Sequence, residues 1–303
     1  MNKIKIPVLF LFPLLLFAVA VLAGVAGDEG WRQELLKERE AKDVEFKTAP
    51  TSPMAGRERL TVAAAEKTFV LVRGGDVKLT AGNEAGTAFA LLFKDGKWFW
   101  ADGAPEVSCR LGERAVAPNA EALPAGSLFK AGRLTLAAYP GPDTLALIVF
   151  DPQRRQQLDF AHLLYYPPDR RFAVRARLEP FPEKREVKII TTRKLEKTFY
   201  RYGRVRFQLQ GKEQALTALK SSLEGPDAAY LFIPFKDMTN GRETYEVGRF
   251  LDVADPGLEE FTLDFNRCYN PLCNYSPAYN CPLPPLENFL DVAVPAGEKT
   301  YPH

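Results

Sequence analysis

The side chains best suited to chemistry lie in the second half of the 303-residue chain. A predicted strand alternates so that Tyr245 and Arg249 share one face among apolar neighbours. An arginine in such a place needs a carboxylate partner to offset its desolvation, and Asp237 or Asp264 can supply one. Two interpretations stay open: a buried ion pair that builds the fold, or a guanidinium that holds a substrate anion.

A run of aspartate, asparagine and tyrosine residues follows at positions 264–271. Side chains of this kind bond the local backbone at turns, and the same groups can orient a polar ligand. Calcium needs about six to eight oxygen ligands, and the acids here match no known calcium loop, so we expect neither a metal nor a cofactor. The candidate ligand-binding residues are Asp237, Thr239, Tyr245, Arg249, Asp264, Asn266, Tyr269, Asn270 and Asn288.

Four cysteines are present, and Cys273 and Cys281 are separated by seven residues in a proline-rich loop. We expect a disulfide between them, worth about 2–3 kcal/mol for so short a loop. A zinc site is disfavoured because no histidine is near and the spacing is unusual for zinc. A catalytic thiol would want a basic neighbour, for which Arg267 is available. Cys109 and Cys268 are either buried free thiols or a second pair, and the sequence leaves that open.

Histidine limits the possible enzyme mechanisms. The chain has two histidines, and His303 is the last residue, so a Ser-His-Asp or Cys-His device would have to use His162. The Gly-x-Ser-x-Gly, phosphate-loop and His-Glu-x-x-His motifs are absent from the sequence. Carboxylate-pair chemistry needs no histidine. A hydrolase using Asp237, Asp264 and Arg249 therefore stays an alternative.

Charge narrows the choice of partners. The formal net charge is +2, and without residues 1–26, which carry Lys3 and Lys5 and no acid, the chain has 38 basic and 38 acidic residues. Phosphate-backbone binding needs excess positive charge, so we expect no nucleic acid partner. We also expect no electrostatic attachment to anionic lipid, and contact with a membrane only through the N-terminal segment.

Residues 1–26 have the pattern of an export signal. A basic head precedes an apolar run from Pro7 to Ala26, and Gly24-Val25-Ala26 fits a small-x-small cleavage site. The apolar run is about 20 residues, which is also long enough for a retained membrane anchor. Either interpretation places the folded part outside the cytoplasm, as a periplasmic, secreted or anchored protein.

The elements that must position these residues are mainly strands. Aromatic residues make up 12% and hydrophobic residues 46% of the chain, and short apolar runs alternate with Gly, Pro and Asp turns, which is typical of sandwiches and barrels. We predict a mainly β protein with two sandwich-like or barrel-like units preceded by a short helix over 28–46. This helix would be solvated, with Asp28 capping its start and a weak apolar face. The predicted strands of the second unit include 242–253 and 289–294. The expected divisions are 1–26 (signal or anchor), 27–59 (helix and linker), 60–150 (first β unit) and 151–303 (second β unit with the Cys/Pro loop).

The second half resembles a bacterial family known as domain of unknown function 1684. The resemblance extends upstream to the segment YYPPDRRFAVRARLEP and to Trp31, Arg39 and Ser52-Pro53, so that it covers nearly all of the mature chain. It implies little about activity, since no function is assigned to that family. The motifs that carry it are Phe235-x-Asp237-x-Thr239-x-Gly241, Thr244-Tyr245-x-x-Gly248-Arg249-Phe250-Leu251, Asp264-Phe265-Asn266, Tyr269-Asn270-Pro271-x-Cys273, Cys281-Pro282-Leu283-Pro284-Pro285, Asn288 and Ala296-Gly297-Glu298-Lys299.

The first β unit resembles a forkhead-associated sandwich through FVLVRGGDVKLTAG and the strands that follow. Arg73 can stand in the arginine position of that family. The serine and histidine positions fall near Gly86 and Phe89, which removes side chains that hold a phosphate. The resemblance therefore implies the sandwich and argues against phosphothreonine binding.

The function that we expect is a non-catalytic extracytoplasmic binding protein. Its cleft would lie in the second β unit, under the Cys273–Cys281 loop and over the strand bearing Arg249, and would take a small polar ligand or a peptide. The alternatives are the hydrolase described above and a purely structural motif. They differ in whether the candidate residues converge on an open pocket or are sealed in the core.

Overall fold

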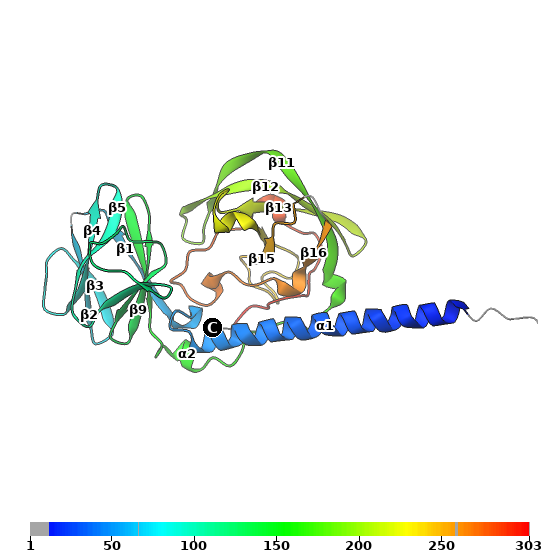
Figure 1. The fold of residues 1–303 in the computed structure, drawn as a ribbon, viewed down its shortest axis with the longest axis horizontal. Helices are drawn as coiled ribbons and strands as arrows, with labels where there is room; N and C mark the ends of the chain where they lie inside the picture. The colour runs from blue at the N-terminus through cyan, green and yellow to red at the C-terminus, as the bar shows by residue number, and fades with distance from the viewer. Residues whose placement is uncertain (1–11, 66, 258–259, 303) are drawn as a thin grey trace, which may run out of the picture.

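A computed structural model describes residues 12–65, 67–257 and 260–302. It shows one long helix and two β units, and the helix α1 (Phe12–Thr48) runs along the second unit toward the first (Figure 1). The prediction of a mainly β protein with two sandwich-like or barrel-like units after a helix is confirmed.

The first β unit consists of two sheets packed face to face. One has the order β1-β10-β9-β8-β6-β7 and the other β3-β2-β4-β5. A single core joins them, in which the rings of Phe89 and Phe129 stack with centroids 4.1 Å apart. The strands are β1 (Gly56–Ala63), β2 (Thr68–Arg73), β3 (Asp76–Thr80), β4 (Thr87–Lys94), β5 (Lys97–Gly103), β6 (Ser108–Leu111), β7 (Arg114–Ala115), β8 (Ser127–Ala131), β9 (Leu134–Pro140) and β10 (Thr144–Phe150).

The second β unit is one strongly curved sheet with the order β15-β14-β13-β12-β11-β16. Its two edges are joined after β16, where Tyr269 exchanges backbone hydrogen bonds of 2.8 and 3.0 Å with Phe250 of β15. The sheet is therefore a nearly closed barrel. Its strands are β11 (Ala173–Ile190), β12 (Glu196–Leu209), β13 (Lys212–Lys220), β14 (Tyr230–Phe235), β15 (Arg249–Ala254) and β16 (Glu260–Asp264).

Short helical turns connect these elements. Ser52 begins the first of them by accepting a hydrogen bond from the Met54 N–H, as an N-cap does. The turns are α2 (Arg155–Leu158), η1 (Pro53–Ala55), η2 (Arg170–Phe172), η3 (Pro226–Ala229), η4 (Phe265–Arg267), η5 (Leu272–Asn274) and η6 (Leu286–Asn288).

Helix α1 is longer than the stretch 28–46 predicted from sequence. It passes through Asp28 without a break, so this residue does not cap its start. The reason is that the apolar run before Asp28 is rich in leucine and alanine, which favour helix. Residues 1–11 of the expected signal or anchor lie outside the described residues. Among the residues that are described, no helix is long and apolar enough to cross a membrane.

Three segments differ from the predicted strands. β1 begins at Gly56, inside the expected linker, because it pairs with β10. The predicted strand over 242–253 is shortened to β15, so Tyr245 lies in the turn before it and does not share a strand face with Arg249. Residues 289–294, also predicted as a strand, form no ladder and make a single bridge at Phe289.

The segment after Phe289 nevertheless has strand-like alternation. Leu290, Val292, Val294 and Ala296 are buried and belong to the core of the second β unit. The residues between them face outward, so the apolar side of an extended segment fills the barrel. Its backbone must then find hydrogen-bond partners other than a neighbouring strand.

Candidate functional site

Arg249 and Asp237 form an ion pair that is sealed from solvent. Nη2 of Arg249 lies 2.7 Å from Oδ2 of Asp237, and both side chains are 0% exposed. The other oxygen of Asp237 accepts hydrogen bonds from the backbone N–H and the hydroxyl of Thr239 at 2.8 and 2.7 Å. The expected cleft over Arg249 is therefore not present, because the pair is enclosed by protein.

This ion pair supplies the backbone partners of the C-terminal segment. The Arg249 guanidinium donates to the carbonyls of Val294 (2.8 Å), Ala296 and Glu298 (3.3 Å), which are alternate residues of the extended segment. The Val294 N–H donates to Oδ1 of Asp237 at 3.2 Å. The two charged side chains thus take the place of a neighbouring strand, which is a structural role.

Asn288 has a similar structural role between β13 and β14. Its amide donates to the carbonyls of Thr217 (2.9 Å) and Pro234 (2.7 Å) and accepts from the Thr217 N–H (2.7 Å). The side chain is 0% exposed, and only Leu219 and Phe232 are in register between these strands. Asn288 therefore bridges a gap in the sheet and does not face a ligand site.

Asp264, Asn266 and Asn270 lie together beneath helix α1. Asp264 accepts hydrogen bonds from the indole N–H of Trp31 (2.8 Å) and from Arg267 (2.7 Å). Asn266 bonds Asp169 through both its amide and its oxygen. Asn270 donates to the Lys299 carbonyl at 2.8 Å. All three side chains are buried, and they fix the loop that faces the helix.

A cavity of about 140 Å³ lies between this loop and α1, and we call it the helix pocket. Two of the predicted residues, Asn266 and Tyr269, line it, whereas Asp237, Arg249 and Asn288 do not. The whole lining is Leu35, Glu38, Arg39, Lys42, Tyr165, Asn266, Arg267, Cys268, Tyr269 and Glu298.

Two of the three cations in the helix pocket are matched by carboxylates. Lys42 lies 2.6 Å from Glu298. Arg267 lies 2.9 Å from Glu38 and 2.7 Å from Asp264. Their charges are therefore largely balanced within the protein.

The third cation, Arg39, has no such match. It is 9% exposed, and its two terminal nitrogens donate to the carbonyls of Tyr166 (2.9 Å) and Asn266 (3.2 Å). Its Nε has no hydrogen-bond partner, and the guanidinium no carboxylate at ion-pair distance, among the described residues. Burial lowers the pKa of Arg39, against the opposing effects of Tyr165 and of nearby acidic groups. A buried cation in this state favours a bound anion.

Glu298 and Tyr165 line the helix pocket, and Tyr275 supports Glu298 from outside it. The Glu298 carboxylate, 1% exposed, accepts from the Tyr275 hydroxyl at 2.6 Å and from the Asn270 N–H at 2.7 Å. The Arg39 guanidinium lies 4.3 Å from the centre of the Tyr165 ring. Burial raises the pKa of Tyr165 and of Tyr275, and Glu298 adds to both effects. These hydroxyls therefore stay protonated and serve as donors.

Tyr245 lies elsewhere, beside the cysteine loop. Its hydroxyl donates to Sγ of Cys273 at 3.7 Å. All four cysteines are free thiols, so the expected Cys273–Cys281 disulfide is not formed in this structure. The two residues are nevertheless adjacent, since the Cys273 N–H donates to Sγ of Cys281 at 3.3 Å. Cys109 lies in the first β unit and Cys268 in the second, each buried in its own core, so they do not pair.

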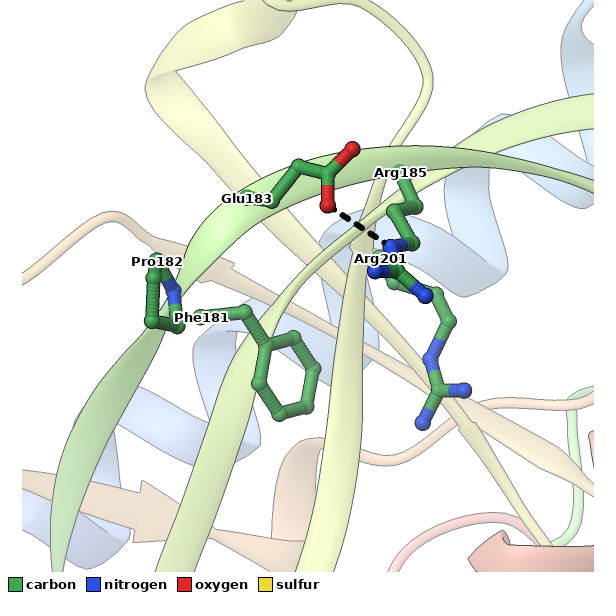
Figure 2. A pocket seen from close by; sticks show the side chains of 5 residues that line it. All are labelled: Phe181, Pro182, Glu183, Arg185 and Arg201. Carbon is green, nitrogen blue, oxygen red and sulfur yellow. Dashed lines mark hydrogen bonds and ion pairs between the residues drawn. The ribbon is translucent and has the colours of Figure 1, made fainter.

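A larger cavity of about 350 Å³ is lined by residues of β11 and β12 in the second β unit (Figure 2). It forms where β11 bulges between Pro180 and Arg185, and it contains two arginines. Arg185 pairs with Glu183 at 2.8 Å, and Arg201 pairs with Glu287 at 3.1 Å. The Nε of Arg201 is unpartnered like that of Arg39, but the charge of Arg201 is already balanced and its side chain is 40% exposed.

Two further cavities lie in the first β unit, with volumes of about 210 and 420 Å³. The smaller is lined by Phe69 of β2, Asn83, residues 87–90 of β4 and residues 102–104. The larger is lined by glycine-rich turns and by Arg133, which pairs with Asp151 at 3.0 Å. Neither holds a buried, unbalanced charge among the described residues, so the helix pocket is the stronger candidate site.

Sequence reasoning missed Arg39, Lys42, Tyr165 and Glu298 as site residues. A signal was present for the first two. Positions 35, 39, 42 and 46 fall on one face of a helix, and this face combines Leu35 and Phe46 with two cations. Cations on the buried face of a helix indicate a polar contact beneath it.

Comparisons with known proteins address the second β unit. A model of the family described as "Protein of unknown function (DUF1684)" matches residues 158–299. An uncharacterized protein of Haloarcula marismortui, solved by NMR in solution, is 33% identical over 48% of this chain and 80% of its own, with a TM-score of 0.41. No curated protein matches the chain.

Residues 158–299, which lie in the second β unit, therefore resemble this family of unknown function. The matched region is narrower than the nearly complete mature chain expected from the motifs. It does not include the first β unit, so the likeness of that unit to forkhead-associated sandwiches stays a prediction. Arg73, which can stand in the arginine position of the forkhead-associated family, is exposed and bonds the Ala85 carbonyl.

Proposed function

We propose that this protein is a non-catalytic binding protein that holds a small anion, such as a short carboxylate, in the helix pocket. The observation that carries the proposal is the buried Arg39 guanidinium. Among the described residues its Nε–H has no partner, and no carboxylate lies within ion-pair distance of it. A bound anion that accepts a hydrogen bond from the Nε–H would give this donor a partner and would also balance the buried positive charge.

The surroundings of Arg39 support a small occupant. A volume of about 140 Å³ accommodates a few non-hydrogen atoms and excludes a peptide segment. The ammonium of Lys42 uses one carboxylate contact, with Glu298, and has further N–H donors that can reach a ligand. The apolar side chain of Leu35 limits the length of the carbon chain that fits.

The hydrolase alternative has less support. Its three residues do not meet at one cavity, because Asp237 and Arg249 are sealed in the barrel core and Asp264 is bonded beneath the helix. A reaction would need at least one of these carboxylates to face substrate and water. We therefore favour binding without catalysis, and we place it outside the cytoplasm because of the signal-like residues 1–26.

Calorimetric titration of the purified chain with acetate, succinate and inorganic phosphate tests the proposal, with chloride as the non-specific anion. We expect one of the three probes to bind. In a thermal unfolding experiment the same probe should raise the melting temperature of the protein, because it binds the folded state. In Arg39→Lys the charge remains but the Nε–H is lost, and we expect the affinity to fall at least about tenfold, since a hydrogen bond to a charged group is worth about 1.5–3 kcal/mol.

Arg32→Gln is the matched control, because Arg32 lies on the exposed face of the same helix. This variant should bind the same probe with wild-type affinity. Equal binding by wild type and Arg39→Lys would reject the helix pocket as the site. An absence of binding by all three probes at millimolar concentration would reject a small-anion function.

A further inference from the structure

We propose that Cys273 and Cys281 form a reversible dithiol–disulfide couple, in which Cys273 exchanges with small-molecule disulfides and Cys281 resolves the product. This site lies apart from the helix pocket and does not depend on the function proposed above. It differs from the structural disulfide expected from sequence, because each thiol has its own role and the reduced pair is a stable state of the fold.

The two thiols are held next to each other by the backbone. The Cys273 N–H donates to Sγ of Cys281 at 3.3 Å. The position of Cys281 is fixed by Thr192, whose N–H donates to the Cys281 carbonyl at 2.9 Å and whose hydroxyl accepts from the Cys281 N–H at 3.2 Å. Disulfide formation therefore needs only a local movement.

The surroundings of the two sulfur atoms differ. Cys273 is partly exposed, and its sulfur accepts a hydrogen bond from the Tyr245 hydroxyl at 3.7 Å. Cys281 is 6% exposed. An accessible sulfur surrounded by donors is stabilised as a thiolate, which is the attacking form, whereas a buried sulfur beside it can act only after the first has reacted.

The acidity of the thiols agrees with this division. The hydrogen bond with Cys281, together with those from Tyr245 and Thr192, lowers the pKa of Cys273 to about 7 despite its burial. The hydrogen bond to Cys273 and burial raise the pKa of Cys281. Burial raises the pKa of Cys109 and of Cys268 to about 12. Tyr245 and Lys197 act on the pair directly, and Glu246 acts on Tyr245. Burial raises the pKa of Tyr269 and of Tyr279, and Cys281 in turn adds to both effects.

The exchange has two balanced steps. The Cys273 thiolate attacks one sulfur of a small-molecule disulfide, forms a mixed disulfide and releases the other half as a thiolate. The Cys281 thiol then loses its proton to solvent, attacks Sγ of Cys273 and releases the second half as a thiolate. The protein loses two electrons and two protons, and the small-molecule disulfide is reduced to two thiols. The opposite reaction, with two small-molecule thiols, restores the reduced pair.

Reaction of the native chain with dithiobis(nitrobenzoate) tests the proposal. The wild type should release two nitrothiobenzoate ions per chain and end as an adduct-free protein that has lost two hydrogen atoms by intact mass. Cys281→Ser should release one ion and keep one adduct on Cys273. Cys273→Ser should lose the fast reaction, with a rate at least about tenfold lower, because the remaining thiols are buried.

Cys109→Ala is the matched control, since this thiol lies in the core of the first β unit, and it should react like the wild type. In a plot of reaction rate against pH, Tyr245→Phe should move the midpoint above that of the wild type, because one donor to the thiolate is lost.

Two results would contradict the proposed dithiol–disulfide couple. The first is a stable adduct on Cys273 of the wild type with no release of a second nitrothiobenzoate ion. The second is a Cys273→Ser variant that reacts as fast as the wild type. If Cys273→Ser does not fold by circular dichroism, wild-type protein labelled with limiting iodoacetamide decides the matter by peptide mapping. A label on any cysteine other than Cys273 would then reject its role as the attacking thiol.

Discussion

The guanidinium of Arg249 and the carboxylate of Asp237 meet at 2.7 Å in a part of the barrel that is closed to solvent on all sides. Together they bond the backbone of the C-terminal segment at Val294 and the next two alternate residues. The same segment then carries Glu298 into the helix pocket. The ion pair therefore positions the site from within the fold without touching a ligand.

Removing one partner of this pair should strongly destabilise the protein. Arg249→Met leaves the Asp237 carboxylate buried without its cation and frees the carbonyls of the C-terminal segment. We expect a loss of about 3–5 kcal/mol in the free energy of unfolding, measured by urea denaturation. Arg206→Met is the control, because its ion pairs are exposed and should contribute less than about 1 kcal/mol. Similar losses in the two variants would contradict the structural role of Arg249.

Gly297 should tolerate no side chain. Its φ is +73°, and a Cβ atom there would lie 2.6 Å from the Cys268 carbonyl oxygen and 2.7 Å from that of Phe265. A side chain here would strain the backbone and overpack the loop. We therefore expect Gly297→Ala to lower the free energy of unfolding by about 2–4 kcal/mol, measured by urea denaturation.

Gly112→Ala separates these two causes. Gly112 also has a positive φ, +56°, but nothing lies within 4 Å of the added Cβ. Gly112→Ala should therefore lower the free energy of unfolding only through backbone strain, by about 1–2 kcal/mol. A loss in Gly297→Ala no larger than this would show that the loop around Cys268 can move away.

The sequence predicted the class of fold because alternation and turn residues are local signals. Strands such as β2, β4, β9 and β10 are each bounded by glycine, proline or aspartate, and the structure has them near the predicted positions. Residues 289–294 were predicted as a strand for the same reason, since their apolar residues alternate. Alternation reports which side chains are buried and says nothing about where the backbone hydrogen bonds go.

The candidate site was harder to predict because its parts come from distant segments. Arg249 attracted attention as a charge among apolar residues, but whether such a charge is sealed or open depends on the C-terminal segment, which no local pattern places over it. Arg39 was overlooked because α1 reads as a solvated helix with a weak apolar face. Only the packing of α1 on the loop after β16 shows that this cation is buried.

Asn288 should be as important to stability as a core apolar residue. Asn288→Ala removes three buried hydrogen bonds and leaves the backbone groups of Thr217 and Pro234 without partners. We expect a loss of about 2–4 kcal/mol in thermal or urea unfolding, since each buried group left unpaired costs about 1–3 kcal/mol. Asn83→Ala, at an exposed position, should stay within about 0.5 kcal/mol of the wild type. A small effect at Asn288 would show that the gap between β13 and β14 closes by itself.

Because of the ion pair between Asp151 and Arg133, the stability of the first β unit should decrease as the pH falls. Hydrogen bonds from Arg133, 3.0 Å away, lower the pKa of Asp151 against the opposing effect of burial, and the Gln153 N–H adds to the lowering. A lowered carboxyl pKa stabilises the folded state above the unfolded value of about 3.9, and this contribution is lost as pH falls through the folded value. Asp151→Asn should therefore be less stable than the wild type at neutral pH, and the gap in free energy of unfolding should narrow below about pH 4. Urea denaturation at a series of pH values measures the gap, and a constant gap down to strongly acidic pH would contradict this assignment.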